Sequence, residues 1–296
     1  MEIIISALVL GSVYGLVAIG ISFTWASIGM LNLAQGFIFT AGGYSAYLFA
    51  QAAEARGLEG PALSIGLLLS GMIGAAIVGF LVGGIAFAPL QDRPNFRTRS
   101  LIATLAISLI GTQVWLLIFG PQNKPLPPIF GSGSLEIAGA TISYSQLGAI
   151  VVAALMLGAL IVWMRFSRSG LQMRAMMMNP LGAAVVGVSV RVTGMRVLAI
   201  SGAFSGLASV LLAQVFFVSP TSGVQPLTVG LIISLAGGLG SLPGTVIAAG
   251  LIGLAEAVTA RYLQQSLVPF VLFGIVVLIL IFRPRGLGGL LEDVRE

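Results

Sequence analysis

The side chains that usually carry enzyme chemistry are nearly absent from this 296-residue chain. It has no histidine and no cysteine, which excludes imidazole bases, thiol nucleophiles, disulfides and soft metal sites. Its only lysine, Lys124, lies in a polar gap, so a phosphate-binding Walker A loop is excluded as well. We therefore expect a protein that is not an enzyme and binds no cofactor of its own.

Glu256 is the clearest ionisable residue inside an apolar stretch, 244–260, because the other acidic residues lie mostly in polar gaps or near the ends. Paired carboxylates for acid–base chemistry are therefore not expected. A lone carboxylate inside a bilayer costs about 2.5–3.5 kcal/mol and is often functional. Glu256 either faces another helix, hydrogen-bonded or paired with Arg261, or lies on the path of a solute.

Two clusters of polar or small residues could contact a solute. Asn32 and Gln35, followed by Gly36, share one face at the start of the apolar stretch 33–52. They would either cap and pack this helix start or line an inner gate. The second cluster interrupts a later stretch with small residues whose backbone groups could line a path: Gly237, Gly238, Gly240, Ser241 and Gly244.

The elements that carry these residues must be membrane helices. Apolar residues make up 57% of the chain, charged residues 8%, and the mean hydropathy is +1.08, whereas a soluble domain carries about a quarter charged residues. We predict an all-α, polytopic membrane helical bundle formed by residues 1–296 as a single domain. At roughly 20 residues for each crossing, the candidate spans are 3–27, 33–52, 62–89, 101–119, 144–164, 194–218, 227–241, 244–260 and 266–282.

The short stretches within 227–260 flank the glycine-rich cluster, which predicts a broken or re-entrant pair and about eight or nine membrane segments. The net charge of +5 concerns orientation rather than nucleic acid, because the arginines gather in a few gaps. Three such gaps, 90–100, 165–193 and the tail after 282, should face the cytoplasm. The amino terminus is then outside and the carboxyl terminus inside.

The gap at 120–143 should lie outside, and its prolines and Gly/Ser residues exclude a helix. The segments 135–137 and 141–143 predict a small β-hairpin, which serves as a connector or as a docking surface for a soluble partner. Elsewhere, small-xxx-small spacing predicts close packing of helices at three glycine pairs: Gly11 with Gly15, Gly79 with Gly83, and Gly202 with Gly206.

The gap at 165–193 contains a short predicted helix. Asn179 can cap its start, Pro180 suits the first helical position, and Gly187 can end it in a left-handed conformation. Arginines on either side, Arg174 among them, favour a helix along the membrane surface that fits a groove in a soluble partner.

This last segment resembles the coupling loop of permeases in the branched-chain amino acid (Liv-type) ABC importer family. Three further stretches agree in order with that family: Leu31–Gly36, similar to its Asn-x-Ala-His-Gly motif; Gly237–Gly244 with Gly253–Ala257, similar to its late glycine motif and helix; and Arg283–Leu287, similar to its tail. The resemblance covers essentially the whole chain. Gln35 stands in place of the family's histidine, so no proton can be taken up there.

The resemblance implies a permease subunit of an ABC importer in the bacterial inner membrane, which moves a branched-chain or other amino acid inward by alternating access. Its partners would be a second homologous permease, two ATP-binding cassette subunits that hold ATP and Mg²⁺, and a periplasmic solute-binding protein. Contact with the ATPase would fall on the coupling segment: Arg174, Asn179, Pro180, Ala183, Ala184 and Gly187.

A stand-alone secondary carrier or channel for a small polar solute is the alternative. It would work without ATPase subunits and would respond to ion gradients, and such carriers usually place ionisable residues in mid-membrane. Glu256 alone fits that pattern. A membrane enzyme is disfavoured because the chain offers no reactive set of side chains.

Overall fold

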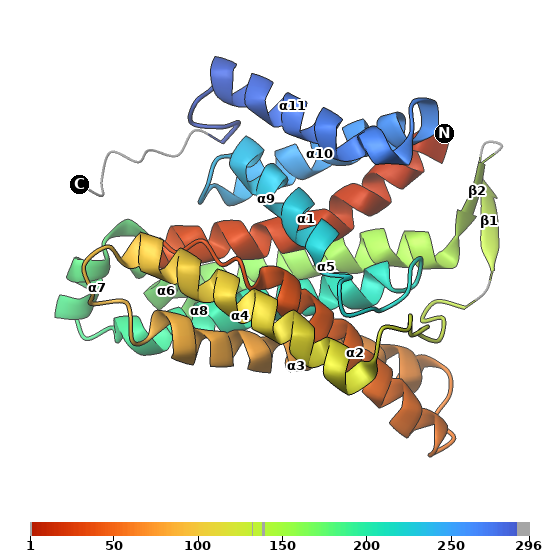
Figure 1. The fold of residues 1–296 in the computed structure, drawn as a ribbon, viewed down its shortest axis with the longest axis horizontal. Helices are drawn as coiled ribbons and strands as arrows, with labels where there is room; N and C mark the ends of the chain where they lie inside the picture. Colours follow the sequence, from red (N-terminus) through yellow and green to blue (C-terminus); the bar gives the residue numbers. More distant parts are fainter. Residues whose placement is uncertain (1, 132, 138–139, 289–296) are drawn as a thin grey trace.

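The chain folds as an elongated helical bundle (Figure 1). The computed structural model describes residues 2–131, 133–137 and 140–288, with 136, 137 and 140 as backbone alone. In this part of the chain seven helical segments are long and apolar enough to cross a membrane: Glu2–Ile28, Pro61–Phe87, Phe96–Phe119, Tyr144–Phe166, Val190–Leu212, Leu242–Tyr262 and Gln265–Phe282. The predicted polytopic helical bundle is confirmed.

The described elements follow one another in the order α1 (Glu2–Ile28), α2 (Gln35–Glu54), α3 (Pro61–Val82) with a π-helical turn (Gly83–Phe87), α4 (Phe96–Phe119), β1 (Ser134–Ile137), β2 (Ala140–Ser143), α5 (Tyr144–Phe166), α6 (Arg168–Met178), α7 (Pro180–Val185), α8 (Val190–Leu212), α9 (Val224–Gly237), α10 (Leu242–Tyr262), a 3₁₀ turn (Gln265–Leu267) and α11 (Val268–Phe282). The predicted spans match α1–α5 and α8–α11. The antiparallel hairpin β1–β2 is also as predicted, and its turn, 138–139, lies outside the described residues.

The structure differs from the sequence-based prediction in two places. The span 194–218 is too long, because α8 ends at Leu212 and the chain continues without a helix to Gly223. In addition, α6 was not predicted. Its sequence is polar for a membrane protein, but Ser167 caps it by accepting a bond from the Gly170 amide (2.8 Å), and Met173 and Met176 are fully buried.

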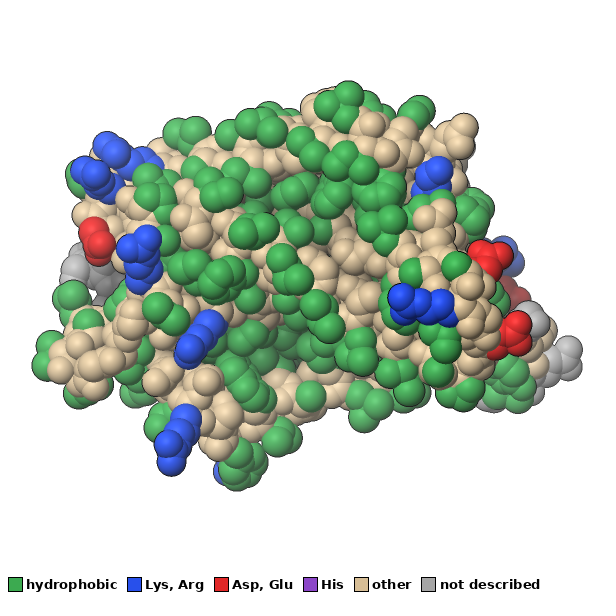
Figure 2. All heavy atoms as spheres, turned by 90° about the horizontal axis from the view of Figure 1, so that it is seen from below, with side chains coloured by type: hydrophobic (Ala, Val, Ile, Leu, Met, Phe, Trp, Pro, Cys, Tyr) green, Lys and Arg blue, Asp and Glu red, His purple; other side chains and the backbone are tan. Residues whose placement is uncertain are grey.

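The bundle has two distinct ends (Figure 1). We call them the hairpin end, which carries β1–β2 and the start of α1, and the α7 end, which carries α7 and the end of α11. The link between α3 and α4 also lies at the α7 end, so the three arginine-rich gaps meet there. In Figure 2 hydrophobic side chains fill the middle of the molecule, while charged side chains collect toward the two ends.

The helices α1–α4 and α8–α11 form two halves that pack in the same order. Helices α1 and α8 lie against each other at the centre, α3 packs along α8, and α10 packs along α1. Likewise α2 contacts α8, and α9 contacts α1. Because α1 runs from the hairpin end and α8 runs toward it (Figure 1), the halves have opposite directions, as in inverted-topology repeats.

Each half contains a helix that begins inside the bundle. Gln35, the first residue of α2, bonds to Ser201 at the midpoint of α8, and Gln225 in the first turn of α9 bonds to Tyr14 near the midpoint of α1. The chain therefore turns back into the bundle after α1 and again after α8. Non-helical backbone at this depth is stable only where protein buries it or where it borders a water-filled cavity.

Close helix contacts depend on the predicted glycine pairs. A Cβ on Gly11 would lie 2.8 Å from the carbonyl oxygen of Ala249, and one on Gly202 would collide with the carbonyl of Ala75. A Cβ on Gly79 would collide with the carbonyl of Leu198. The role of these glycines in packing is thus confirmed.

Candidate functional site

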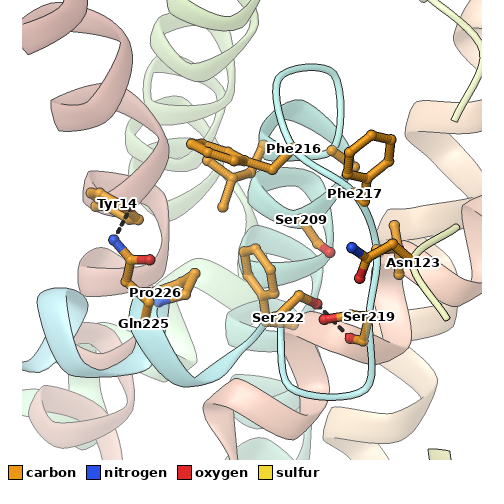
Figure 3. A pocket seen from close by; sticks show the side chains of 13 residues that line it. Tyr14, Asn123, Ser209, Phe216, Phe217, Ser219, Ser222, Gln225 and Pro226 are labelled. Atoms are coloured by element: carbon orange, nitrogen blue, oxygen red, sulfur yellow. Dashed lines mark hydrogen bonds between the residues drawn. The ribbon is translucent and has the colours of Figure 1, made fainter. Parts of the chain in front are cut away.

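The segment that follows α8 borders a cavity of about 260 Å³ near the hairpin end, with both polar and apolar side chains in its lining (Figure 3). Four regions of the chain meet there: α1, α2, the 120–143 loop and the segment from the end of α8 into α9. The lining consists of Tyr14, Phe39, Asn123, Ser209, Leu212, Ala213, Phe216, Phe217, Val218, Ser219, Ser222, Gln225 and Pro226. A paired backbone bridge between Lys124 and Val218 holds the loop against this segment.

Several polar groups of the lining point toward one another in Figure 3. The amide of Gln225 donates to the hydroxyl oxygen of Tyr14 (3.2 Å), and the hydroxyl of Ser222 donates to the carbonyl oxygen of Ser219 (2.8 Å). Within the described residues, the side chains of Ser209 and Asn123 make no hydrogen bond. The cavity therefore presents unpaired donors and acceptors, which is typical of a ligand site.

Next to the lining residues Phe39 and Ser222, the starts of α2 and α9 are in backbone contact. A Cβ on Gly36 would lie 2.7 Å from the carbonyl oxygen of Gly223, where the starts of α2 and α9 meet. Gly36 precedes the lining residue Phe39 by about one helical turn in α2, and Gly223 directly follows the lining residue Ser222. Only glycine allows this approach, and neither Gly36, one of the predicted pathway residues, nor Gly223 belongs to the lining itself.

Asn32 and Gln35 lie just before Gly36 in the sequence and are fully buried. Asn32 donates to the side-chain oxygen of Gln35 (3.0 Å) and accepts from the Ala34 amide (3.0 Å). The Gln35 amide nitrogen lies within hydrogen-bonding distance of Ser201 (2.9 Å to Oγ) and of Ser205, both on α8. The side chains of Asn32 and Gln35 thus form hydrogen bonds with protein groups, and the bonds of Gln35 connect α2 to α8.

The late glycine cluster packs against the tail of the chain. Ser241 caps α10 by accepting from the Gly244 amide (3.1 Å). The amide of Gly288 donates to the carbonyl of Gly237 (2.8 Å), and Gly238 and Gly240 adopt positive φ angles of 88° and 89°. A Cβ on Gly238 would lie 2.6 Å from the carbonyl oxygen of Arg285. Two separate motifs of the sequence thus form one contact at the α7 end.

Glu256 is buried in α10, and its Oε2 atom has no hydrogen-bond partner. Of the alternatives for Glu256, pairing with Arg261 is not present, since no ion pair joins these two described residues and Arg261 is exposed. The reason is helical geometry: residues five apart project from different faces of a helix. Glu256 is also absent from the lining of the cavity.

The predicted coupling segment forms α6 and α7 at the α7 end (Figure 1). Asn179 caps α7 by accepting from the Gly182 amide (2.9 Å), Pro180 occupies its first position, and Gly187 follows it with φ 88°. Arg174 in α6 donates to the carbonyl oxygen of Arg165 (3.2 Å). Ala183 is buried while Ala184 is exposed, so α7 turns one face to the bundle.

Sequence reasoning missed the cavity and most of its lining, including Tyr14, Ser209 and Gln225. These residues are single polar side chains within apolar helices, and they form no spacing pattern from which a binding site could be predicted. One signal was available: Gln214, Ser219 and Pro220 are unusual in a continuous membrane helix and mark the interruption after α8.

Comparison with known proteins gives consistent results. A profile of the family described as branched-chain amino acid transport system, permease component, matches residues 3–282. The high-affinity branched-chain amino acid transport system permease protein LivH of Salmonella typhimurium is 29% identical over 289 residues, covering 95% of this chain and 92% of that protein. The permease protein BraD of Pseudomonas aeruginosa is 28% identical over 294 residues, covering 97% and 94%.

One solved structure, PsaBC from Streptococcus pneumoniae in complex with Fab, aligns with 96% of this chain and 93% of that chain. The sequence identity is 14% and the TM-score is 0.48.

Proposed function

The chain belongs to the family of permease components of branched-chain amino acid transport systems, and we propose that it forms one membrane subunit of an ABC importer for a small amino acid. In this proposal ATP and Mg²⁺ bind to partner ATPase subunits, and a second permease and a solute-binding protein complete the importer. The named relatives, which are branched-chain amino acid permeases, favour leucine, isoleucine or valine as the solute.

The exposed apolar face of α7 is the observation that carries this proposal. Leu181 is 81% exposed, Val185 is 87% exposed and Val186 is 77% exposed. They stand at the arginine-rich end, which is the end expected in the cytoplasm. An apolar cluster on a water-facing surface is typical of a protein–protein contact. A groove on an ATPase subunit would cover it.

The connections of α7 explain how motion in the ATPase would reach the cavity. Helices α6 and α7 join α5 to α8. Helix α8 is bonded to α2 through Gln35, and its end leads into the lining of the cavity. A rigid-body shift of α7 would therefore move α8 and separate Gly36 from Gly223, and the parting of these two backbones would open a path from the cavity toward the cytoplasm.

The orientation follows from the same charges. With the α7 end in the cytoplasm, the hairpin end faces the periplasm and the cavity lies on the side from which the solute arrives. The 120–143 loop would then be a docking surface for the solute-binding protein, because its residue Asn123 lines the cavity.

Co-purification combined with transport tests the proposal. The tagged chain, expressed with its partners, should retain two ATPase subunits and a second permease, and vesicles that contain the complex should take up leucine only when ATP is supplied to the ATPases. Replacing Leu181 and Val185 with glutamate should release the ATPase subunits, whereas Leu181→Met with Val185→Ile should retain them. Recovery of the chain alone, active without ATP, would instead establish a solitary carrier.

A further inference from the structure

Helix α4 is attached to the bundle along one narrow face. It contacts chiefly α2 and the π-helical turn, and it has the smallest buried share, 11%, of the seven candidate spans in the described part of the chain. On the attached face, Thr104 accepts a bond from the Leu33 amide (3.2 Å), and a Cβ on Gly111 would collide with the ring of Phe37. The opposite face of α4 is left uncovered by the described residues.

The uncovered face is apolar with one exception. Four aliphatic side chains on it are 47–65% exposed: Ile102, Leu105, Leu109 and Ile110. Gln113 follows Leu109 by four residues and is also exposed, so it belongs to the same face. No charged residue occurs between Arg99 and the end of α4 at Phe119, so this part of the helix is suited to lie within the membrane.

The side-chain amide of Gln113 has no hydrogen-bond partner among the described residues. Its neighbour Thr112 satisfies its own hydroxyl, which donates to the Ser108 carbonyl one turn earlier (2.8 Å). The Gln113 amide has two donor hydrogens and an acceptor oxygen. Lipid tails offer a partner to neither, so an exposed and unbonded amide at this position is unfavourable. Another membrane helix can supply the partner, because glutamine side chains form hydrogen bonds across helix contacts.

We propose that the face of α4 that carries Gln113 is the contact surface for the second permease, and that Gln113 forms a hydrogen bond with a helix of that subunit. Among the partners proposed above, the ATPases and the solute-binding protein meet the chain at its two ends. The second permease is the partner that can reach a surface within the membrane. The proposal rests on the permease function and adds the location of this contact.

Helix α11 shows what a homologous partner would offer to α4. It has the same place in the second half that α4 has in the first, since α4 packs on α2 and α11 packs on α9. The span that contains α11 has the next-smallest buried share, 17%. A Cβ on Gly274, in the middle of α11, would meet nothing within 4 Å, so the backbone is open to close approach there. A homologue of this chain would thus carry an uncovered helix that can lie against α4.

Photo-cross-linking in the complete complex tests this surface. The photoreactive residue p-benzoyl-phenylalanine replaces Leu109, one turn from Gln113, or Leu155 in the middle of α5 as the matched control. The two leucines are 63% and 68% exposed, so both positions have room for the probe. Irradiation of membranes that contain the complex should join the Leu109 probe to a second permease subunit, identified by mass spectrometry. The Leu155 probe should give several-fold less of this adduct.

The outcomes distinguish the surface from the function. If uptake requires ATP and the partners co-purify, but the Leu109 probe joins only lipid or a soluble subunit, the surface is wrong and the permease function stands. If the Leu109 probe joins a second copy of this chain while uptake needs no ATP, the surface stands and the importer function is wrong. Equal yields of the permease adduct from Leu109 and Leu155 would overturn the assignment to α4.

Gln113→Leu tests the hydrogen bond itself. The change removes no bond within the described part of this chain, so the amount of the chain recovered in membranes should be unchanged. The amount of second permease that co-purifies should fall several-fold, as for the loss of a hydrogen bond between membrane helices. Gln51→Leu, at an exposed glutamine in α2, should retain the second permease. Unchanged co-purification with Gln113→Leu would show that Gln113 makes no bond to the partner.

Discussion

Gln35 shows how a polar side chain can be structural inside a membrane bundle. Its amide joins Asn32 on its own chain segment to Ser201 and Ser205 on α8, and all four residues are fully buried. Each unpaired group in this environment costs more than in water, so the cluster is stable only when complete.

Gln35→Leu should therefore destabilise the protein, because it leaves the side-chain nitrogen of Asn32 and the hydroxyls of Ser201 and Ser205 without their partner. The expected loss is about 1–3 kcal/mol for each unsatisfied group, which should lower the thermal unfolding temperature in detergent. Gln51→Leu is a matched control on the same helix, since Gln51 is exposed and bonds only to Tyr47 (2.8 Å). Equal unfolding temperatures for both variants would show that the Gln35 cluster contributes no stability.

Unlike the hydrogen-bonded side chain of Gln35, the buried carboxylate of Glu256 has one oxygen atom, Oε2, without a hydrogen-bond partner. Glu256→Gln removes a buried carboxylate of nearly the same shape, so the unfolding temperature should stay the same or rise. Uptake driven by ATP should be unchanged, and Glu59→Gln, at an exposed residue, should change neither quantity. Loss of uptake with normal ATPase activity in Glu256→Gln would place this carboxylate on the solute path.

At the scale of elements, the contact between the starts of α2 and α9 depends on the size of two residues. A Cβ on Gly223 would collide with the carbonyl of Gly36 and approach Thr40 (2.8 Å to its Oγ1). Because both partners are parts of packed backbone, neither can move aside easily.

Gly223→Ala should therefore force α2 and α9 apart, lower the unfolding temperature and impair uptake. Gly250→Ala is the control, because a Cβ there meets nothing within 4 Å; in α10 it should be neutral or stabilising by about 0.5–1 kcal/mol. The two variants can be compared by thermal unfolding in the same detergent, and a Gly223→Ala variant as stable as the parent would show that this contact can open without cost.

At the scale of the whole molecule, the distribution of charge predicts the orientation. The arginine-rich gaps meet at the α7 end, so that end should be cytoplasmic. Glu59→Cys, in the link between α2 and α3, should react with a membrane-impermeant maleimide in spheroplasts, whereas Asp92→Cys, in the link between α3 and α4, should react only after lysis. The chain contributes no other thiol. The opposite labelling pattern would reverse the orientation.

Composition and local pattern were sufficient for much of the fold. Apolar runs predicted the membrane helices, because lipid accepts only segments that satisfy their own backbone bonds. The cap at Asn179, the stop at Gly187 and the two strands of the hairpin were predicted for the same reason: each depends on residues a few positions apart.

Which residues come together at the candidate site is determined by the tertiary structure and could not be predicted from the sequence. Tyr14 meets Gln225 from α9, Gly36 meets Gly223, and Gln35 finds its partners on α8, far along the chain in every case. The early end of α8 at Leu212 was likewise missed, because the apolar residues that follow fit a helix as well as the wall of a cavity. Local sequence determines which segments enter the membrane, whereas a cavity exists only where distant segments pack together and leave their polar groups unpaired.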